Sequence, residues 1–308
     1  MDLSIIVVSF NTKELVLECL ASINKTIKGV SFEVWLVDNN STDGTVEAVG
    51  KEYPDVTIIG NKQNLGFAAA NNQAFRQMNG RYALLLNSDT VLTNGAAREL
   101  YGFMEVTPEA GMACGQLLNQ DGSKQNSIAN FPSLLTLLSN ETVLRMVMPN
   151  RFPSKRRDYV SPIEVDSGIG ACLIVRKAAM DDAGYFDERY FFFFEETDWA
   201  YRMKRGGWAT YFVPSTRIFH AQGKTVGSGV NSRIMFYRSR YLFFRKWHPG
   251  SYPVFYLIIF FRLLINVILS FMGLVITLGL ETSTRKRFVV YIQLIAWHLR
   301  GCPEKRGK

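Results

Sequence analysis

Acidic side chains stand directly after two apolar, β-branched stretches of this 308-residue sequence. Asp38 follows residues 32–37, and Asp89 comes shortly after residues 81–86. Asp38 can accept hydrogen bonds from ribose hydroxyls or a pyrimidine N–H, although an ordinary turn also explains an aspartate there. Asp89 can ligate a hard divalent cation, Mg²⁺ or Mn²⁺, that bridges two phosphates; a helix cap is the alternative interpretation.

A denser cluster of acids follows four consecutive phenylalanines in the segment FDERYFFFFEETDW. Its carboxylates, Glu195, Glu196 and Asp198, repel one another, and the aromatic side chains remove water, so we expect raised pKa values and a group able to act as a base. On a helix, Glu195, Asp198 and Arg202 share one face, while Glu196 points about 100° away. One acid can therefore pair with Arg202 while another reaches a cleft. A solvated acidic helix start is the alternative.

His220 follows a β-like stretch at residues 209–219 and precedes a glycine-containing loop that carries Lys224. This position makes His220 a candidate second metal ligand and Lys224 a candidate phosphate ligand, with a purely structural histidine as the alternative. The sequence has no GxxxxGK[ST] loop and no GxGxxG fingerprint, which removes the usual support for P-loop ATPases, kinases and dinucleotide oxidoreductases. No module that interleaves basic and aromatic residues appears, so nucleic acid is not an expected partner.

The elements that must position these residues alternate between strand and helix patterns. Strands are expected at 3–10, 32–37, 56–59, 81–86, 165–175 and 209–219, and helices at 13–23, 45–51, 93–103, 134–148 and, mainly, 181–205. This alternation predicts an α/β fold with a mostly parallel, doubly wound central sheet flanked by helices. Ligands of such sheets bind beyond the carboxyl ends of the strands. We therefore expect Asp38 and Asp89 to face one crevice, with Ser9, Asn11 and Asn87 among the nucleotide-sugar ligands.

The composition changes near Pro249, and residues 254–280 are almost wholly apolar. Residues 263–280 form an 18-residue run without a charge, close to the roughly 20 that a spanning helix needs, yet both flanks are basic. Basic residues favour the cytoplasmic side, and a single crossing cannot place both ends there. We therefore expect a re-entrant or in-plane helical pair, with Arg262 reaching toward the surface. A single span and a buried core helix are the alternatives.

The chain carries a formal charge of +8, so a polyanionic partner such as anionic lipid or a phosphorylated substrate is expected. We predict a catalytic domain at 1–248, with a nucleotide-binding half at about 1–100 and an acceptor half at about 101–248. The apolar and basic region 249–308 would associate with the membrane. The basic, proline-containing RFPSKRR at 151–157 is interpreted as part of an insertion.

Taken in order, several motifs resemble those of the family 2 glycosyltransferases of the GT-A fold, similar to bacterial rhamnosyltransferase-like enzymes. The motifs are SIIVVSFN, VDNNSTDGT, NLGFAAANN, LLLNSDT, SGIGACLIVRK, FDERYFFFFEETDWAYRMKRGGW and the loop after His220, over about residues 1–225. The resemblance implies an inverting, metal-assisted transfer from a nucleotide-diphospho-sugar. It assigns nucleoside binding to Asp38, the nucleoside pocket to Asn64 and Gly66, and the metal to Asp89.

The same resemblance matches Glu196 to the general base and His220 to a histidine near the metal and diphosphate. Two positions differ from the family pattern. Asn87 stands where the metal motif often has a first acid, and Glu196 stands where relatives mostly carry aspartate. Glu195 and Asp198 therefore remain rival candidates for the base.

These observations predict transfer of a sugar from a UDP- or dTDP-linked donor to a hydroxyl of a saccharide acceptor in cell-surface polysaccharide synthesis, and a lipid-linked acceptor is expected. The expected location is the cytoplasmic face of the inner membrane, against an anionic surface. Two alternatives stay open: a polyprenyl-phosphate glycosyltransferase, which needs no strong base, and a membrane-tethered sugar-nucleotide-binding protein without catalysis.

Overall fold

The computed structural model describes residues 1–139, 141–149, 151–153, 157–221 and 230–302. The chain divides into two compact units. Unit 1 comprises Met1–Phe131 and Ser139–Thr225, and unit 2 comprises Pro132–Leu138 and Val226–Lys308. Lys224 and the centre of the RFPSKRR segment lie outside the described residues.

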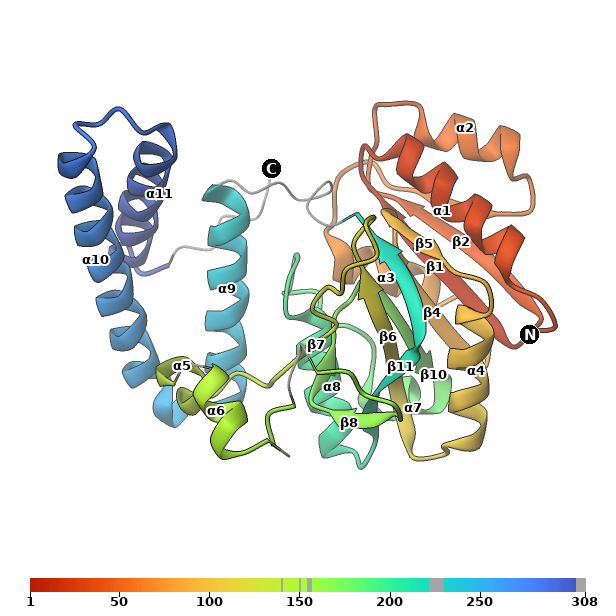
Figure 1. The fold of residues 1–308 in the computed structure, drawn as a ribbon. Coiled ribbons are helices and arrows are strands. Elements are labelled where there is room, and N and C mark those ends of the chain that lie inside the picture. The colour runs from red at the N-terminus through yellow and green to blue at the C-terminus, as the bar shows by residue number, and fades with distance from the viewer. Residues whose placement is uncertain (140, 150, 154–156, 222–229, 303–308) are drawn as a thin grey trace. The chain divides into compact units, whose positions relative to one another are not determined.

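Within the described residues, unit 1 is built on a nine-stranded sheet in the order β3-β2-β1-β4-β10-β6-β11-β5, with β8 added beside β11 (Figure 1). The strands are β1 (Leu3–Ser9), β2 (Phe32–Asp38), β3 (Thr57–Gly60), β4 (Tyr82–Asn87), β5 (Thr90–Leu92), β6 (Ala110–Leu118), β8 (Ile163–Val165), β10 (Cys172–Arg176) and β11 (Ala209–His220). A separate antiparallel pair joins β7 (Ile128–Ala129) to β9 (Ser167–Gly168).

The first half of the sheet is parallel, as predicted: β1 lies between β2 and β4, and β2 pairs with β3. The second half is mixed. Strand β10 runs antiparallel to β4 and β6, while β11 is parallel to β6 and antiparallel to β5 and β8. The expected α/β fold is therefore confirmed, and the reversed strands bring loops from the second half to the carboxyl ends of the first.

Helices cover both faces of this sheet. One face packs against α1 (Lys13–Thr26), α2 (Thr45–Glu52) and α4 (Ala96–Val106), and the other against α3 (Phe67–Phe75), α7 (Lys177–Ala183) and α8 (Glu195–Arg205) (Figure 1). Alternate residues of β1 point to opposite faces: Leu3, Ile5 and Val7 contact the first layer, and Ile6 the second. Each such fully buried aliphatic side chain contributes about 1.5–3 kcal/mol relative to exposure.

Asp43 fixes the beginnings of two helices. Its Oδ2 accepts the Lys13 N–H at the start of α1 at 2.9 Å, and its Oδ1 accepts the Thr45 N–H at the start of α2 at 3.1 Å. Neither helix has a side-chain bond from its own N-cap residue. One carboxylate thus satisfies orphan donors of both helices and fixes the loop after β2 against the loop after β1.

Two expected helices are interrupted. The 134–148 segment forms α5 (Leu134–Leu138) and α6 (Glu141–Val147), which belong to different units. The 181–205 segment is helical only in α7 and α8, because the backbone between them takes positive φ angles at Gly184, Phe193 and Phe194. Consecutive left-handed residues cannot continue a right-handed helix.

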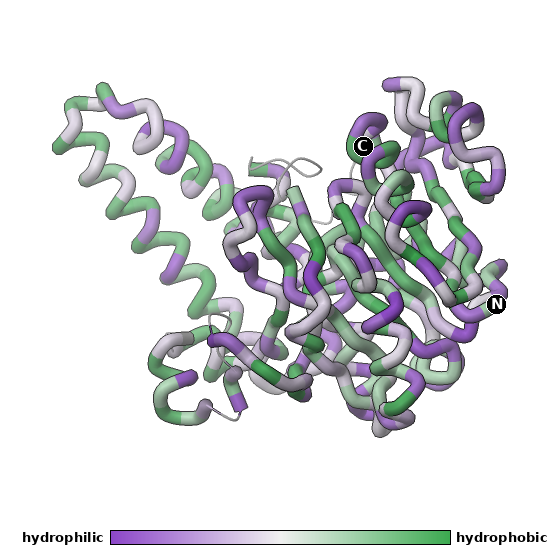
Figure 2. Tube along the Cα trace, turned by 45° about the vertical axis from the view of Figure 1, so that its right-hand side comes forward, coloured by the Kyte–Doolittle hydropathy of each residue, from purple (hydrophilic) through white to green (hydrophobic). Residues whose placement is uncertain are grey.

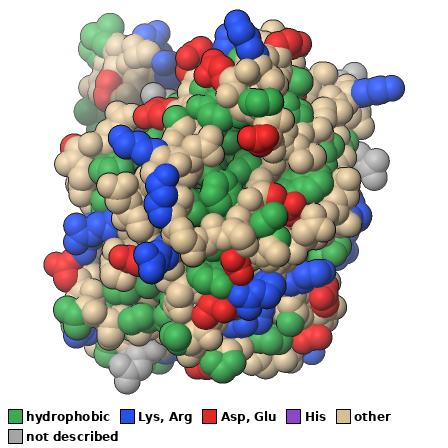
Figure 3. All heavy atoms as spheres, turned by 90° about the vertical axis from the view of Figure 1, so that its right-hand side faces the viewer, with side chains coloured by type: hydrophobic (Ala, Val, Ile, Leu, Met, Phe, Trp, Pro, Cys, Tyr) green, Lys and Arg blue, Asp and Glu red, His purple; other side chains and the backbone are tan. Residues whose placement is uncertain are grey.

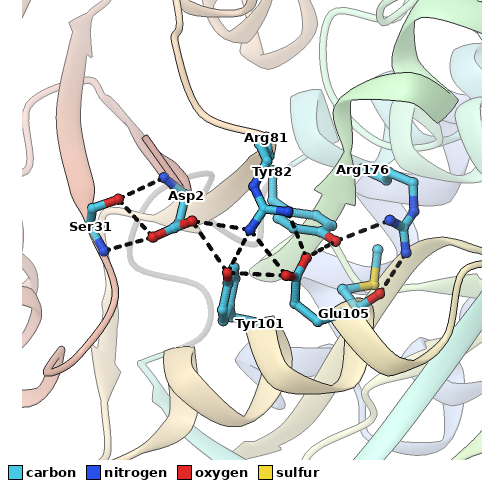
Figure 4. A network of polar contacts seen from close by, with 8 residues as sticks. Asp2, Ser31, Arg81, Tyr82, Tyr101, Glu105 and Arg176 are labelled. Carbon is cyan, nitrogen blue, oxygen red and sulfur yellow. Dashed lines mark hydrogen bonds and ion pairs between the residues drawn. The ribbon is translucent and has the colours of Figure 1, made fainter.

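A polar network lies at the end of the sheet where β1 and β4 begin (Figure 4). Arg81 pairs with Asp2 at 3.1 Å and with Glu105 at 3.0 Å. Arg176 donates to the carbonyls of Met104 and Thr107 at 2.6 and 2.9 Å, and so satisfies the C-terminal end of α4.

Replacing Arg176 by Met should destabilise unit 1 by about 2–4 kcal/mol, because the carbonyls that its guanidinium satisfies would lose their donor. Equilibrium denaturation of the full chain followed by tryptophan fluorescence would measure the loss. Arg98→Met on the exposed side of α4 is the matched control, with an expected change of about 0.5 kcal/mol or less. Equal stability of the two variants would contradict this role of Arg176.

Unit 2 is helical in its described part. It contains α5, α9 (Val230–Trp247), a 3₁₀ turn η1 (Pro249–Ser251), α10 (Tyr252–Ile276) and α11 (Thr282–Leu299). The domain boundary expected after residue 248 differs from this division, because α9 contributes Tyr241 and Phe244 to the core of the C-terminal helices. The Phe244 and Phe255 rings stack at 3.9 Å, and the Tyr241 hydroxyl lies 2.7 Å from His298 Nδ1.

Hydrophobic residues run along most of α10 (Figure 2). Of the described helices, only the stretch Pro249–Ile276 is long and apolar enough to cross a membrane, and 22% of its most apolar part is buried. Large side chains such as Phe261, Ile265 and Leu269 are exposed. The α10 helix is therefore not the buried core helix considered as an alternative.

Candidate functional site

The carboxyl ends of β1 and β2 bring Ser9 and Asp38 into register. The Ser9 hydroxyl donates to Asp38 Oδ1 at 2.7 Å, and Ser41 donates to the same carboxylate from its hydroxyl at 2.5 Å and from its N–H at 2.8 Å. Asp38 is buried. Two donors occupy Oδ1 and one occupies Oδ2, so a single acceptor position remains on Oδ2. The turn interpretation is thus correct in geometry, and it leaves Asp38 able to accept one further hydrogen bond.

Asn11 supports the same edge through the loop after β2. It adopts a φ of 52°, and its side-chain oxygen accepts the Thr42 N–H at 2.8 Å. Its own N–H donates to the Ser41 hydroxyl at 2.8 Å. Asn11 therefore holds the loop that contacts Asp38.

The loop before α3 connects β2 to the phenylalanine run. Asn39 Nδ2 donates to the Gly66 carbonyl at 3.2 Å, and Asn64 Oδ1 accepts the Gly66 N–H at 2.9 Å. Gly66 has a φ of 84°, and a Cβ there would lie 2.4 Å from the Phe191 carbonyl oxygen. The next residue, Phe67, donates its N–H to that carbonyl at 2.8 Å. Only glycine permits this approach, which places the residues before Glu195 against the strand ends.

A second connection reaches the acids from β4. The Asn87 N–H donates to the Ala171 carbonyl at 3.0 Å. Gly170, one residue earlier, donates a backbone hydrogen bond to Glu196, and a Cβ on it would stand 3.8 Å from the Glu196 carboxyl carbon. The acids of α8 and the end of β4 therefore lie on the two sides of one short loop.

Glu195 and Glu196 begin α8, where Glu195 is buried and Glu196 is partly buried. Burial raises the pKa of Glu196 to about 7, against the opposing effect of backbone N–H groups from Gly170 and Thr197. Burial and the neighbouring charge of Glu196 raise the pKa of Glu195 well above its ordinary value. One oxygen of each carboxyl is buried without a hydrogen-bond partner. The expected direction is found at Glu195 and Glu196.

Asp198 is fully buried and already paired. Arg202 donates to its Oδ2 at 3.0 Å, and the Tyr190 hydroxyl donates to its Oδ1 at 3.3 Å. Arg202 also donates to the Tyr185 carbonyl at 2.6 Å, which ties α8 to the segment before it. The expected pairing of one acid with Arg202 is thus made by Asp198, which has the geometry of a positioning group for α8.

The turn that leads into α8 is strained. Phe193 and Phe194 both have a φ of 70°, a conformation that costs a non-glycine residue about 1–2 kcal/mol. Packing of the preceding rings offsets this cost, since Phe192 lies edge-on to Phe67 at 6.0 Å and to Phe193 at 4.7 Å. The strained turn presents Glu195 and Glu196 together at a helix N-terminus, where the macrodipole favours their charged forms.

Asp89 and His220 come together across the pairing of β5 and β11. His220 Nε2 lies 3.4 Å from Asp89 Oδ1, which has no hydrogen-bond partner. Gln125 donates its amide to the His220 carbonyl at 2.7 Å, so its oxygen, 2.9 Å from Nδ1, must accept from that nitrogen. In the neutral ring, the lone pair of Nε2 then faces a carboxylate oxygen. A proton or a cation between these two acceptors would relieve their repulsion.

The residues present fit a divalent cation in part. Asp89 offers an oxygen without a partner and His220 a nitrogen, and Mg²⁺ or Mn²⁺ usually completes its coordination with water and substrate phosphates. Among the described residues, no group of three or more His, Cys, Asp or Glu side chains could hold a metal ion. Asn87 lies at the end of β4, separated from Asp89 only by Ser88, and adds no charge.

The structure thus places Ser9, Asp38 and Asn87 at the carboxyl ends of β1, β2 and β4, and separate backbone hydrogen bonds join this edge to the segment before α8 and to the loop at Gly170. Lys224 lies outside the described residues. Three residues of the site were not predicted from the sequence. Gln125 orients His220, Gly170 contacts Glu196, and Phe191 contacts Gly66. Gly170 is the second glycine of the SGIGACLIVRK motif, so the motif contained a signal for it. No local pattern marks Gln125, which lies 95 residues from His220.

Glu195→Gln should stabilise the protein at about pH 8 and have little effect at about pH 5. Because the folded pKa of Glu195 lies above its unfolded value, the folded state holds more protons there, and stability falls as pH rises through the folded pKa. The amide variant escapes this loss. Thermal unfolding at both pH values would test it, with Glu164→Gln at an exposed site as control. A variant less stable than the parent at pH 8 would contradict the burial of a charge at Glu195.

Comparisons with known proteins give a family match and several relatives. The family model described as "Glycosyl transferase family 2" matches residues 4–184. An N-acetylglucosaminyl-diphospho-decaprenol L-rhamnosyltransferase of Mycobacterium tuberculosis is 30% identical over 233 residues, covering 70% of this chain and 76% of that protein.

Two solved structures share the fold. S. aureus TarS 1-349, in complex with UDP, superposes with a TM-score of 0.53 at 17% identity, over 79% of this chain and 65% of that one. GalNAc-T7, with UDP, GalNAc and Mn²⁺, gives a TM-score of 0.55 at 14% identity, over 81% and 51%. This chain covers only part of the length of both proteins.

Proposed function

The chain belongs to glycosyl transferase family 2, and from that premise we propose that it transfers a sugar, with inversion, from a UDP- or dTDP-linked donor to a hydroxyl of a lipid-linked saccharide during cell-surface polysaccharide synthesis. The observation that carries the proposal is the placement of Glu196, with a pKa of about 7, at the sheet edge that also holds Asp38 and Asp89. The name of the mycobacterial relative supports the lipid-linked acceptor, and the UDP complex of TarS supports the donor class.

We propose that Asp38 holds the nucleoside of the donor. Its free acceptor position on Oδ2 suits a pyrimidine N–H or a ribose hydroxyl, and burial keeps water from competing. Ser9 and Ser41 orient the carboxylate, while Asn11, Asn64 and Gly66 shape the adjoining loops. Asn87 would contact the donor near its diphosphate, and Lys224 remains a candidate ligand for the same group.

Glu196 is proposed as the general base. It takes the proton from the acceptor hydroxyl as that oxygen forms its bond to the anomeric carbon, while the bond to the diphosphate breaks on the opposite face. A pKa near 7 leaves a substantial fraction ionised and basic enough to accept the proton. Glu195, more deeply buried, is the rival, and Asp198 is engaged by Arg202.

Asp89 and His220 are proposed to hold Mg²⁺ or Mn²⁺, which when bound supplies positive charge to the departing diphosphate. The Mn²⁺ in the GalNAc-T7 structure supports this choice. Gln125 keeps the Nε2 lone pair of His220 directed at Asp89, so the pair is arranged before ligand arrives.

Glu196→Gln should retain donor binding and lose turnover by about 10²–10⁴-fold, because the amide cannot accept the proton. In the parent enzyme, kcat/KM should rise with pH through about 7, and this acidic limb should vanish in the variant. Purified protein, a panel of UDP- and dTDP-sugars and a lipid-linked acceptor would provide the assay.

Glu188→Gln, on the exposed part of the same segment, is the matched control and should keep near-normal turnover. Near-normal turnover of Glu196→Gln would move the base to Glu195. If Glu195→Gln were equally active, a polyprenyl-phosphate acceptor, whose anionic oxygen needs no strong base, would be favoured. Absence of both transfer and donor hydrolysis in the parent would favour a binding protein without catalysis.

Asp89→Asn and His220→Gln should each weaken Mn²⁺ binding in the presence of UDP by about 10-fold or more, because each removes one ligand. Electron paramagnetic resonance of free Mn²⁺ would measure the affinity. Asp121→Asn, in an exposed turn, is the control for loss of one negative charge. Unchanged Mn²⁺ affinity in Asp89→Asn would contradict the metal assignment.

We also propose that unit 2 associates with the anionic cytoplasmic face of the inner membrane. Of the 35 Lys and Arg residues, 13 lie in residues 226–308 with only 2 of the 27 acids, which leaves the remaining chain slightly acidic. The face of the molecule at the right of Figure 1 carries interspersed acidic and basic side chains (Figure 3). The basic excess beside the exposed apolar side chains of α10 suits an anionic bilayer surface.

A further inference from the structure

Arg240 on α9 lies in an unusual electrostatic setting. It is partly buried, and its Nε is enclosed without a hydrogen-bond partner. Glu281 is the only acid among residues 230–302, and its carboxylate bonds Ser283 and Thr284 at the start of α11. The described part of unit 2 therefore offers Arg240 no carboxylate partner. Burying an unpaired guanidinium is unfavourable, because the charge loses its hydration without gaining a partner.

A second guanidinium, that of Arg262 on α10, adds to this cost. Burial lowers the pKa of Arg240, the Tyr237 side chain opposes that effect, and the charge of Arg262 lowers the pKa further. The charges of both guanidinium groups lower the pKa of Tyr237, against the larger effect of burial, which raises it. Among the described residues Arg262 makes no ion pair, so two like charges from neighbouring helices share a region without an anion. An anionic ligand would remove both their repulsion and their lack of partners.

An apolar groove begins at the same place. It has a volume of about 490 Å³ and lies between α5 and α10, with Leu137 and Leu138 on one side and apolar side chains of α10 on the other. Arg262 and Asn266 are its polar lining residues. The α10 residues that line it recur at helical spacing, from Ile258 through Ile265, and so share one side of the helix. A ligand that matches this groove has a long apolar chain and an anionic end.

The position of Arg262 along α10 favours a ligand at the bilayer surface. Arg262 is ten residues beyond Tyr252, which corresponds to about 15 Å at 1.5 Å per residue. If α10 crossed the bilayer, this charge would lie near the middle of a hydrocarbon core about 30 Å thick. A lipid phosphate can reach Arg262 only if α10 lies at the boundary between headgroups and acyl chains, where an exposed apolar face and a basic surround are both accommodated.

We propose that Arg240 and Arg262 bind the phosphate of one anionic phospholipid of the bilayer, whose acyl chain lies in the groove between α5 and α10. The inference rests on the proposed membrane association and specifies its ligand. Planar guanidinium groups suit phosphate oxygens through paired hydrogen bonds, and Asn266 stands beside them in the groove. The lipid supplies the counter-charge that unit 2 lacks and anchors α10 in the plane of the membrane.

Phosphatidylglycerol binding to the full chain tests the proposal. Native mass spectrometry of the detergent-solubilised protein should show one phosphatidylglycerol retained per chain, and Arg262→Gln should lose it. Co-sedimentation with phosphatidylcholine vesicles that contain phosphatidylglycerol should show an affinity loss of about 10-fold or more for this variant. Arg285→Gln, an exposed charge on α11, is the matched control, with about a 5-fold loss from its single charge.

Salt separates the specific site from general attraction. At about 1 M salt the screening length is about 3 Å, so the control and the parent should bind alike while Arg262→Gln stays weaker. Arg240→Gln should behave like Arg262→Gln, and Arg240→Lys should regain part of the binding. If Arg240→Gln fails to fold, as judged by circular dichroism, the exposed Arg262 still decides the question.

Equal lipid retention by Arg262→Gln and Arg285→Gln would overturn the proposal. So would retention of farnesyl diphosphate in preference to phosphatidylglycerol, which would assign the groove to an isoprenoid ligand. These readouts need no sugar transfer. A protein that binds phosphatidylglycerol through Arg262 but transfers no sugar would contradict the proposed function and support this site. A protein that transfers sugar but binds phosphatidylglycerol equally well without Arg262 would support the proposed function and contradict this site.

Discussion

Parallel pairing of β1 with β2 and β4 is the constraint on which the candidate site depends. Parallel strands in register deliver their carboxyl ends to one edge, so Ser9 and Asp38 meet directly and Asn87 ends beside them. The reversed strand β10 then returns the loop at Gly170 and Ala171 to that edge. Without the change from parallel to mixed pairing, the acids of α8 would have no backbone connection to the end of β4.

Bringing carboxylates to this edge carries a free-energy cost that the local structure offsets only in part. Burial raises the pKa values of Glu195 and Glu196, whereas the N-terminus of α8 and the N–H groups of Gly170 and Thr197 favour the charged forms. Two left-handed phenylalanines add strain at the same point. This concentration of unfavourable terms is typical of positions where chemistry, and not stability, determines the residue.

The two units differ in how they manage charge. In unit 1, one buried acid finds a donor, as Asp198 does in Arg202, and another lies 3.4 Å from a ring nitrogen, as Asp89 does from His220. Unit 2 combines an excess of basic residues with a helix whose apolar side chains are exposed. In its described part, Arg240 Nε is enclosed without a hydrogen-bond partner and Arg262 makes no ion pair. The proposed anionic bilayer surface would satisfy both features.

The sequence by itself determined the α/β fold, the strands that carry Asp38 and Asp89, and the acid cluster of α8, because alternation of apolar residues and turn chemistry are local properties. Tertiary structure alone decided which acid is paired, because Arg202 forms an ion pair with Asp198 whereas Gly170 lies beside Glu196. It also decided the mixed pairing in the second half of the sheet, the strained turn before α8 and the partner of His220. Those outcomes depend on contacts between residues far apart in the chain, and no local pattern records which distant groups will meet.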